Sequence, residues 1–209
     1  VKGDVMEKKP NILLILTDQQ RRDSIGAYGC GYPATPTLDA LAAQGTRYDC
    51  AYCNAPVCTP SRASILTGKR LSGHGVYNLF DILPEGQRLL PAALRDQGYY
   101  TGLVGKLHVS GIMYESQRRN PGDGFDVYEL SHEPSVLLDA PQNAYGAWLR
   151  EHWPEDYRRL LREGRDWKER PARSHFSAWV SQRSAEFIRR RDREKPFFLS
   201  MGYFDPHSP

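Results

Sequence analysis

The sequence has no long hydrophobic run and only a small net charge. No stretch of its 209 residues approaches the ~20 consecutive apolar residues of a transmembrane helix, so we expect no membrane partner. The formal net charge of +3 is too small to indicate nucleic acid as a partner. Basic residues outnumber acidic ones between residues 158 and 195, which predicts a solvated helical surface that can also attract an anionic substrate.

Cysteine is also scarce, and four cysteines in the whole chain argue against a disulfide scaffold. Cys50 and Cys53 form a Cys-x-x-Cys pair, but no second pair completes a zinc site, so we interpret both as packing residues. Residues 1–10 lack the apolar core of a signal peptide. We therefore expect a cytoplasmic protein, or a periplasmic or secreted one if the start is truncated, and we interpret residues 1–9 as a tail.

What the sequence does contain is a series of short apolar runs separated by helical patterns. The run from Asn11 to Thr17 predicts a central strand of a parallel sheet, buried on both faces, and the run from Phe197 to Gly202 predicts another. The fold class is therefore α/β, a mostly parallel central sheet flanked by helices. Periodicity and end signals predict helices over residues 35–45, 89–97 and from 174 onward, and residues 46–52 are interpreted as a further strand or as an extended approach to Cys58. The first of these helices carries its apolar residues Leu38, Leu41 and Ala42 on one face.

The stretch from Cys58 to Gly68 places a cysteine at the start of a short helix. Thr59 is predicted as the N-cap and Pro60 as the first helical residue, and Gly68 can end the helix in the left-handed conformation. Cys58 then faces the unpaired N–H groups and the positive dipole end of the helix, which favour an anion there. Arg62, one turn further on, returns to the same face and can reach the Cys58 side chain.

Polar side chains follow the predicted strands at the ends where open α/β sheets bind ligands. The first strand delivers Asp18 and Gln19 to that edge of the sheet. A later predicted strand ends in Lys106 and His108, and their i, i+2 spacing puts both on one face of an extended strand. His207 follows the last strand. Each has an ordinary alternative, because Asp18 can cap a turn, His207 can be a turn residue, and a Lys and His pair is common at a surface.

Two strings resemble the signatures of a known family. Residues 58–68, Cys-Thr-Pro-Ser-Arg with Leu-Thr-Gly at a fixed distance, resemble the signature of the type I sulfatases. Residues 98–108, Gly-Tyr-x-Thr-x-x-x-Gly-Lys-x-His, resemble their second signature. The resemblance implies a fold of the alkaline phosphatase superfamily and hydrolysis of a small-molecule sulfate ester. It runs over residues 10–209 but covers only the N-terminal portion of a typical sulfatase, so we expect the C-terminal part of the catalytic domain to lie outside this chain.

The resemblance also implies roles for single residues. Cys58 would be oxidised to formylglycine by a formylglycine-generating enzyme, and the hydrated aldehyde would be the nucleophile. Lys106 would contact both the sulfate and the formylglycine, His108 would orient and deprotonate the nucleophile, and Arg62 would position it. His207 would bind the sulfate or protonate the departing oxygen. For Cys58 this displaces the ordinary interpretation of a buried packing thiol.

A metal ion, calcium in preference to Mg²⁺ or Mn²⁺, is implied at the end of the first strand. Its expected ligands are Asp18, Gln19 and the converted Cys58, with an amide where many members of the family have a second acid. A hard cation takes ~6–8 oxygen ligands, so we expect the others from the absent C-terminal half or from a partner chain that supplies it. His74 and Asn78 are predicted to contact the substrate. Residues 131–173 are predicted to form an excursion of the chain over the mouth of the active site.

Three alternatives remain open. One is a phosphonate or phosphate monoester hydrolase built on the same site, although Lys106 and His108 favour a sulfatase. Another is a catalytically incomplete fragment that only binds anions, because metal ligands are missing. The third is a cysteine hydrolase, which lacks an evident Cys–His–Asn pattern in this sequence.

Overall fold

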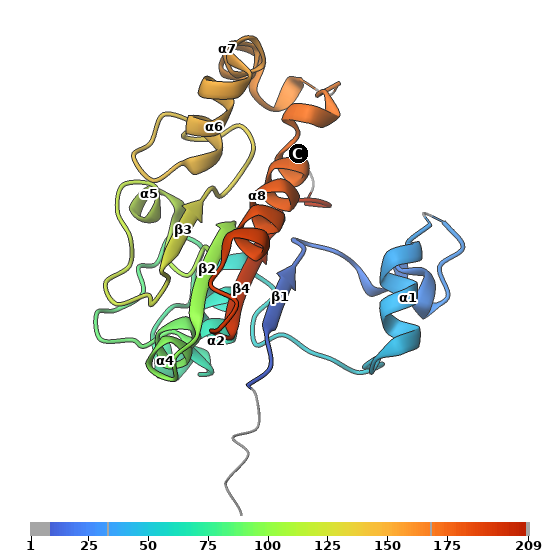
Figure 1. Cartoon of the computed structure of the whole chain (residues 1–209), viewed down its shortest axis with the longest axis vertical. Coiled ribbons are helices and arrows are strands. Elements are labelled where there is room, and N and C mark those ends of the chain that lie inside the picture. Colours follow the sequence, from blue (N-terminus) through green and yellow to red (C-terminus); the bar gives the residue numbers. More distant parts are fainter. Residues whose placement is uncertain (1–8, 33, 168, 208–209) are drawn as a thin grey trace, which may run out of the picture.

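Figure 1 shows a computed structural model of the chain, which describes residues 9–32, 34–167 and 169–207. Within these residues the strands form one parallel sheet in the order β1-β4-β2-β3. The strands are β1 (Ile12–Leu16), β2 (Tyr100–Gly105), β3 (Val127–Leu130) and β4 (Phe197–Gly202). The predicted α/β class and the parallel sheet are confirmed.

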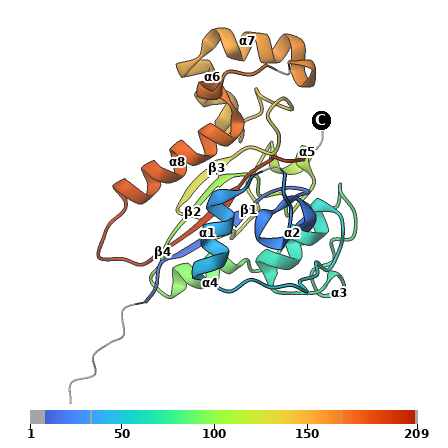
Figure 2. The same ribbon diagram turned by 90° about the vertical axis from the view of Figure 1, so that its right-hand side faces the viewer.

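Helices cover both faces of the sheet (Figure 2). On one face lies α8 (Phe176–Arg190), with α6 (Ala144–His152) and α7 (Pro154–Glu163) beyond its N-terminal end. On the other face lie α2 (Cys58–Thr67) and α4 (Leu90–Asp96). Side chains alternate between the two cores as a pleated strand requires: Leu199 and Met201 pack under α8, whereas Phe198 packs toward α2 and α4.

The first strand is at the edge of the sheet, and its predicted central position was wrong. The central strand is β4, which lies between β1 and β2 and is buried along its whole length. In β1, Ile12 and Leu14 pack against the core on the α2 side, but Leu13 and Ile15 are 45% and 47% exposed. The reason is that α8 packs on β2 and β4 and leaves the outer strand uncovered on that face.

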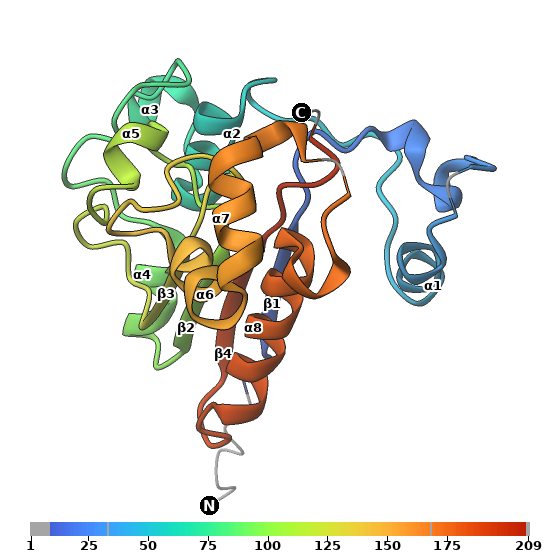
Figure 3. The same cartoon turned by 90° about the horizontal axis from the view of Figure 1, so that it is seen from above.

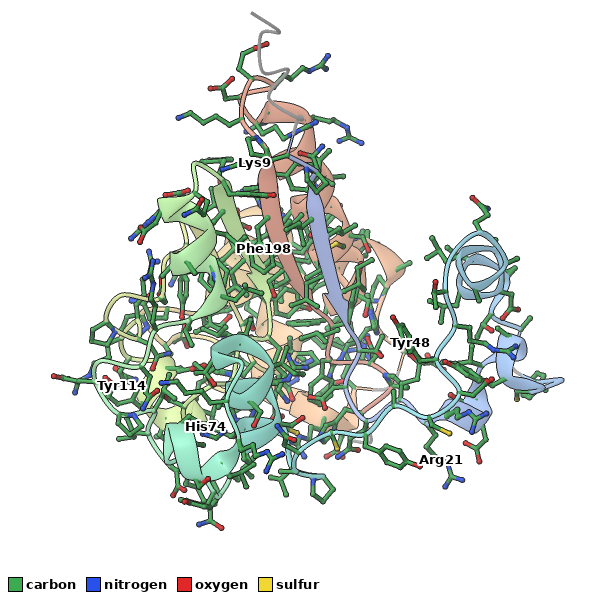
Figure 4. All side chains as sticks on the ribbon, turned by 90° about the horizontal axis from the view of Figure 1, so that it is seen from below. Lys9, Arg21, Tyr48, His74, Tyr114 and Phe198 are labelled. Carbon is green, nitrogen blue, oxygen red and sulfur yellow. The ribbon has the colours of Figure 1, made fainter. Side chains whose placement is uncertain are left out.

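Residues 20–32 and 34–52 form an arm that stands apart from the sheet in Figures 1 and 3. The arm contains η1 (Arg22–Ser24), η2 (Gly26–Tyr28) and α1 (Pro36–Gln44). The predicted first helix is therefore present, but it buries no residue, and Leu41 on its apolar face is 57% exposed. Arg21 and Tyr48 lie on this arm, away from Phe198 in the sheet (Figure 4).

Other predicted boundaries also need correction. Residues 46–52 form no strand, and Cys50 and Cys53 are exposed rather than packed. The helix predicted from residue 174 onward begins at Phe176 as α8, and the ring of the N-cap residue His175 accepts the Ser177 N–H. The remaining short helices are α3 (Leu71–His74), α5 (Ile112–Glu115), η3 (Gly164–Asp166) and η4 (Ala172–Ser174).

Residues 131–173, for which no regular element was predicted, contain α6 and α7. Their buried residues Tyr145, Leu149 and Leu160 join the core under α8. Among the described residues, no helix combines the length and the apolarity that crossing a bilayer requires. The predicted tail falls mostly on residues 1–8, outside the described part of the chain.

Candidate active site

The carboxyl ends of three strands and the start of α2 meet at one edge of the sheet. Two glycines let β2 and β4 end side by side: a Cβ on Gly105 would stand 2.1 Å from the carbonyl oxygen of Gly202, and Gly105 has a φ of +95°. The N–H of Lys106 then donates to the Gly202 carbonyl at 2.9 Å. The side chains gathered here come from β1 (Asp18), β2 (Lys106), β4 (His207) and α2 (Cys58, Arg62).

Asp18 is the centre of this cluster and is 5% exposed. Its Oδ2 lies 2.5 Å from Nζ of Lys106 and 3.7 Å from Nη2 of Arg62, and Sγ of Cys58 lies 3.5 Å from its Oδ1. Burial alone would raise the pKa of Asp18, but Lys106, Arg62 and His207 together hold it below its ordinary value. One buried carboxylate therefore faces two cations, and the excess positive charge favours an anionic ligand.

The thiol of Cys58 stays protonated in this setting. Burial raises its pKa, Lys106 opposes that, and the neighbouring Asp18 raises it further, so the net pKa lies above the ordinary value. A reactive cysteine needs the thiolate form. The unmodified Cys58 is thus poorly placed to act as a cysteine nucleophile.

The helix α2 starts two positions before the predicted start. Val57 is the N-cap and Cys58 is the first helical residue, because the Val57 carbonyl already accepts the N–H of Ser61 at 3.1 Å. Thr59 is not a cap: its hydroxyl donates to the Leu79 carbonyl at 2.9 Å. Gly68 ends the helix with a φ of +67°, as predicted.

Lys106 and His108 both reach the site, but not along one face of a strand. The strand β2 ends at Gly105, and His108 is left-handed with a φ of +57°. The Lys106 carbonyl accepts Nη1 of Arg62 at 2.8 Å, which ties the two cationic residues together. Nε2 of His108 lies 3.1 Å from the hydroxyl of Thr59, the neighbour of Cys58. Burial first, and then Lys106, lower the pKa of His108 far below its ordinary range, so the ring is neutral.

His207 connects the cluster to a neighbouring cavity. Single ligand atoms of Asp18, Cys58 and His207 all lie within 4.8 Å of one another, and the His207 ring stacks on Phe204 at 4.7 Å. His207 also lines a cavity of ≈ 240 Å³ whose other walls include residues 133–135, Arg165, Trp167, Arg170, His175 and Asp205. A second cavity of ≈ 220 Å³, lined by Asp18, Gln19 and Cys58 among others, opens on the α2 side.

Two predicted substrate contacts are not brought to this cluster. His74 on α3 (Figure 4) is fully buried, its Nδ1 accepts the Val76 N–H, and its Nε2 bonds to the Ser64 hydroxyl. Both ring nitrogens are thus used within the fold, and the predicted substrate role of His74 has no geometric support. Asn78 is exposed and lines neither cavity, although the next residue, Leu79, carries the carbonyl bonded to Thr59.

Several residues beside the site were not found from the sequence. Glu115 is completely buried and accepts the backbone N–H groups of the turn that carries His108. His132 packs edge-on against His108, with ring centroids 5.2 Å apart. His132 follows β3 as Asp18 follows β1. The rule that ligand-binding residues follow the carboxyl ends of parallel strands could therefore have found it. No pattern of the sequence indicates Glu115.

The described residues fit part of a calcium site. Asp18 contributes a buried carboxylate, and Gln19, exposed with a φ of +55°, lines the same cavity and contributes an amide oxygen. Calcium takes ~6–8 oxygen ligands, and neither a thiol nor an imidazole is its usual donor. The described part of the chain therefore offers one side of such a site.

Comparison with known proteins is consistent with this geometry. A family model described as Sulfatase matches residues 10–209. The arylsulfatase of Clostridium perfringens is 35% identical over 219 residues, which cover 96% of this chain and 44% of that protein. The N-acetylgalactosamine-6-sulfatase of Homo sapiens is 29% identical over 220 residues, which cover 96% of this chain and 40% of that protein.

Solved structures share the fold. The phosphonate monoester hydrolase of Agrobacterium radiobacter matches with a TM-score of 0.71 at 24% identity, covering 96% of this chain and 42% of that one. A protein solved with its substrate D-glucosamine-2-N,6-O-disulfate matches with a TM-score of 0.68 at 25% identity, covering 96% of this chain and 35% of that one. The chain thus spans less than half the length of each of these four proteins.

Proposed function

Because the chain belongs to the sulfatase family, we propose that it carries the nucleophile of a sulfuric ester hydrolase in which Cys58 is converted to formylglycine. The observation that carries the proposal is the position of Cys58. It is the first residue of α2 and lies beside Asp18, whose carboxylate also holds Lys106 and Arg62. A sulfate group next to Cys58 would meet two cations and the positive end of a helix.

The proposed nucleophile explains why a cysteine stands at this position. The hydrate of formylglycine supplies one hydroxyl that attacks sulfur and a second that releases sulfate as the aldehyde is restored. A serine has only one hydroxyl, so it cannot release sulfate by this elimination. The protonated state of the Cys58 thiol supports this proposal over a cysteine hydrolase, which needs a thiolate. The partners are a formylglycine-generating enzyme during maturation and a small-molecule sulfate ester as substrate.

The other side chains of the cluster take roles that follow from their positions. Lys106 offsets the negative charge that grows on the sulfate oxygens, and Arg62, bonded to the Lys106 carbonyl, holds the nucleophile in place. His207, between the cluster and the ≈ 240 Å³ cavity, donates a proton to the departing alcohol oxygen. His108 is neutral and accepts the proton of the second hydroxyl.

We propose that Asp18, Gln19 and an oxygen of the converted Cys58 hold one side of a calcium ion. When bound, such an ion polarises the sulfate oxygens and lowers the pKa of the nucleophile. The remaining oxygen ligands would come from the C-terminal part of a protein as long as the relatives, or from a partner chain.

We assign the alcohol part of the substrate to the ≈ 240 Å³ cavity beside His207. The proposed proton donor His207 lines this cavity, and its ring also lies within 4.8 Å of Cys58, so an alcohol held there would leave beside its proton donor. Its walls alternate donors and acceptors, among them Glu133, Arg170 and Asp205, which suits an alcohol with several hydrogen-bonding groups. In this proposal residues 131–173 form part of the active-site mouth.

A phosphonate or phosphate monoester hydrolase remains the second candidate, and the likeness of fold to a phosphonate monoester hydrolase favours it. Rates on paired aryl sulfate, phosphate and phosphonate esters decide between the two. A catalytically incomplete anion-binding fragment would bind these esters without turnover.

The central test is the state of Cys58 in the complete protein, produced together with a formylglycine-generating enzyme. The Cys58 peptide should be lighter by ~18 Da, the change from thiol to aldehyde, and sulfate turnover should depend on it. Cys58→Ala should abolish turnover, and Cys58→Ser should leave at most a single turnover. Full multiple turnover by Cys58→Ala would refute the proposed nucleophile.

A further inference from the structure

The turn after β2 holds His108 in an unusual backbone conformation. His108 has a φ of +57°, in the left-handed region that residues other than glycine rarely adopt. Such a conformation persists only where the surroundings enforce it. The enforcing group is the carboxylate of Glu115, at the end of α5 and completely buried.

Glu115 binds three consecutive backbone N–H groups of this turn. Its Oε2 accepts the N–H of His108 at 2.9 Å, and its Oε1 accepts those of Val109 at 3.0 Å and Ser110 at 2.8 Å. Asn120 adds a fourth donor to Oε1 at 2.8 Å. Burying a carboxylate is a costly way to satisfy backbone amides, which points to a requirement beyond folding.

The ring of His108 is fixed at its other end by Thr59. The Thr59 hydroxyl has a single proton and donates it to the Leu79 carbonyl at 2.9 Å. The contact of 3.1 Å between that hydroxyl and Nε2 of His108 therefore requires Nε2 to be the donor. His108 is then the Nε2–H tautomer, and its Nδ1 carries the lone pair that can accept a proton.

A second ring prevents His108 from rotating. His132 lies edge-on to His108 at an angle of 69°, is 4% exposed, and has its Nε2 3.5 Å from Oε2 of Glu115. Glu115 thus contacts the backbone of His108 and approaches the ring that packs on its side chain. Both contacts come from one carboxylate.

We propose that Glu115 is the positioning residue of His108: it holds the left-handed turn so that Nδ1 of His108 presents its lone pair to the reacting group. The inference rests on the proposed role of His108. Glu115 itself does not touch the substrate. Its removal should therefore alter the rate of proton transfer and leave binding of the sulfate ester nearly unchanged.

The protonation of Glu115 gives the proposal a pH signature. Burial raises the pKa of Glu115 to about 7, against the opposing effect of its hydrogen bonds. The titratable and charged groups that face it are Arg62 from α2, His108 after β2, and Tyr128 and His132 from β3 and beyond. A protonated Glu115 oxygen is a poorer acceptor for the turn, so kcat should fall as the pH drops through about 7.

The test compares Glu115→Gln with a matched control in the complete, matured protein. Glu115→Gln should lower kcat by ~10-fold or more and leave KM within ~2-fold, because a misplaced catalytic group costs rate rather than binding. The acid limb near pH 7 should disappear from its kcat profile. The control is Glu129→Gln on β3, which removes a partly buried carboxylate that pairs with Arg183 of α8. This variant should leave both kcat and KM unchanged.

Nitrogen NMR of the imidazoles adds a readout that does not depend on turnover. His108 should show Nε2 protonated and Nδ1 free in the wild type, and a mixture of tautomers in Glu115→Gln. The inference would be overturned if a folded Glu115→Gln variant kept the kcat, the pH profile and the His108 tautomer of the wild type. The proposed role of Cys58 would still stand in that case. Loss of the Cys58 requirement would overturn the proposed function instead.

If Glu115→Gln does not fold, hydrogen exchange in the wild type decides the matter. The amides of His108, Val109 and Ser110 should be protected about as strongly as those of β2, since all three are bonded to a buried carboxylate. Exchange at the rate of an exposed loop would overturn the inference.

Discussion

At the scale of single residues, Asp18 decides both the charge and the shape of the site. Its carboxylate is buried together with Lys106 and Arg62, so the cluster carries one positive charge in excess when the thiol of Cys58 is protonated. That excess attracts an anion only while Asp18 keeps the two cations in place. Removal of Asp18 would leave both cations buried without their partner.

The first prediction is that Asp18→Asn destabilises the protein and weakens its dependence on calcium. Breaking a buried ion pair costs ~3–5 kcal/mol, because the remaining charge stays buried without compensation. Denaturant unfolding measures the first effect, and calcium titration of activity in the complete protein measures the second. Gln19→Ala is the control: its side chain is exposed, so stability should hardly change while calcium dependence weakens mildly. Unchanged calcium titrations in both variants would place the metal elsewhere.

The second prediction concerns acid stability and follows from three buried histidines and one buried glutamate. Burial lowers the pKa of His132 to about 3, that of His108 far below its ordinary range and that of His74 below its ordinary value, whereas burial raises the pKa of Glu115 to about 7. Below pH ~6.5 the unfolded chain protonates histidines that the folded chain keeps neutral, so their stabilisation is lost as pH falls. Glu115 acts in the opposite direction, because between its ordinary pKa and about 7 the folded chain binds the extra proton.

Each group contributes a slope of up to ~1.4 kcal/mol per pH unit, so three histidines against one glutamate leave a net loss of stability on acidification. Urea unfolding at pH 7, 6 and 5 should show this loss. His132→Asn should reduce the slope by ~1.4 kcal/mol per pH unit, since two histidines then oppose one glutamate. An identical slope in the variant would mean that His132 is protonated in the folded protein.

Much of the residue-level site follows from one rule, that parallel strands deliver ligand-binding residues at their carboxyl ends. That rule led to Asp18, Lys106 and His207, which the structure does bring together. His74 was predicted as a substrate contact without this rule, and its place in a Gly-rich loop does not reveal that the fold uses both ring nitrogens. The rule could not reach Glu115, because a buried acid on a four-residue helix has no periodicity to mark it.

At the scale of elements, boundaries were harder to predict than their existence. The strand before Asp18 was predicted, but its position in the sheet was not. A short apolar run has the same sequence pattern in an edge strand as in a central one. The helix at Cys58 was predicted, but its N-cap is Val57 rather than Thr59, and a backbone carbonyl replaces the expected side-chain cap. The helices α6 and α7 were missed, although Tyr157, Leu160 and Leu161 in α7 recur at helical spacing.

The third prediction tests the close approach of β2 and β4 at the site. Gly105→Ala combines a left-handed backbone with a Cβ 2.1 Å from the Gly202 carbonyl, so the ends of the two strands must separate. Gly98→Ala is a matched control: its φ is +86°, but no atom lies within 4 Å of the added Cβ. The control should cost ~1–2 kcal/mol, the penalty of a left-handed side chain.

Gly105→Ala should lose more stability than the control and also most of its activity, because Lys106 follows directly and would move away from Asp18. Thermal unfolding and turnover of both variants check this. Equal stability losses in the two variants would show that the strand ends separate without cost.

At the scale of the whole molecule, the exposed apolar surface is uneven. One part of it lies along β1 and α1, where Leu13 is 45% exposed, Ile15 is 47% exposed and Leu41 is 57% exposed, and another part includes Phe80 and Met113. The other edge strand, β3, is at most partly exposed. The chain also spans less than half the length of its relatives. We therefore propose that the outer face and edge of β1 are covered in a protein of the relatives' length.

The last prediction follows from that surface. Residues 1–209 produced alone should associate through the free edge of β1, because an unpaired apolar edge strand is a template for pairing with another chain. They should show no sulfatase turnover, because the described residues supply only one side of the proposed metal site. We expect this association at β1 and not at β4, because β1 is an edge strand whereas β4 already has a neighbouring strand on each side.

The informative variant is Ile15→Lys, tested in both lengths. In the 209-residue chain it places a charge on an exposed position of an edge strand, so light scattering should show less association and unfolding should change little. In a protein of the relatives' length the same lysine would be buried, and the variant should lose stability by several kcal/mol, as an unpaired buried charge does. Lys9→Glu, at an exposed position before the strand, should be neutral in both. A monomeric, fully active 209-residue chain, or an Ile15→Lys variant harmless in both lengths, would show that nothing covers β1.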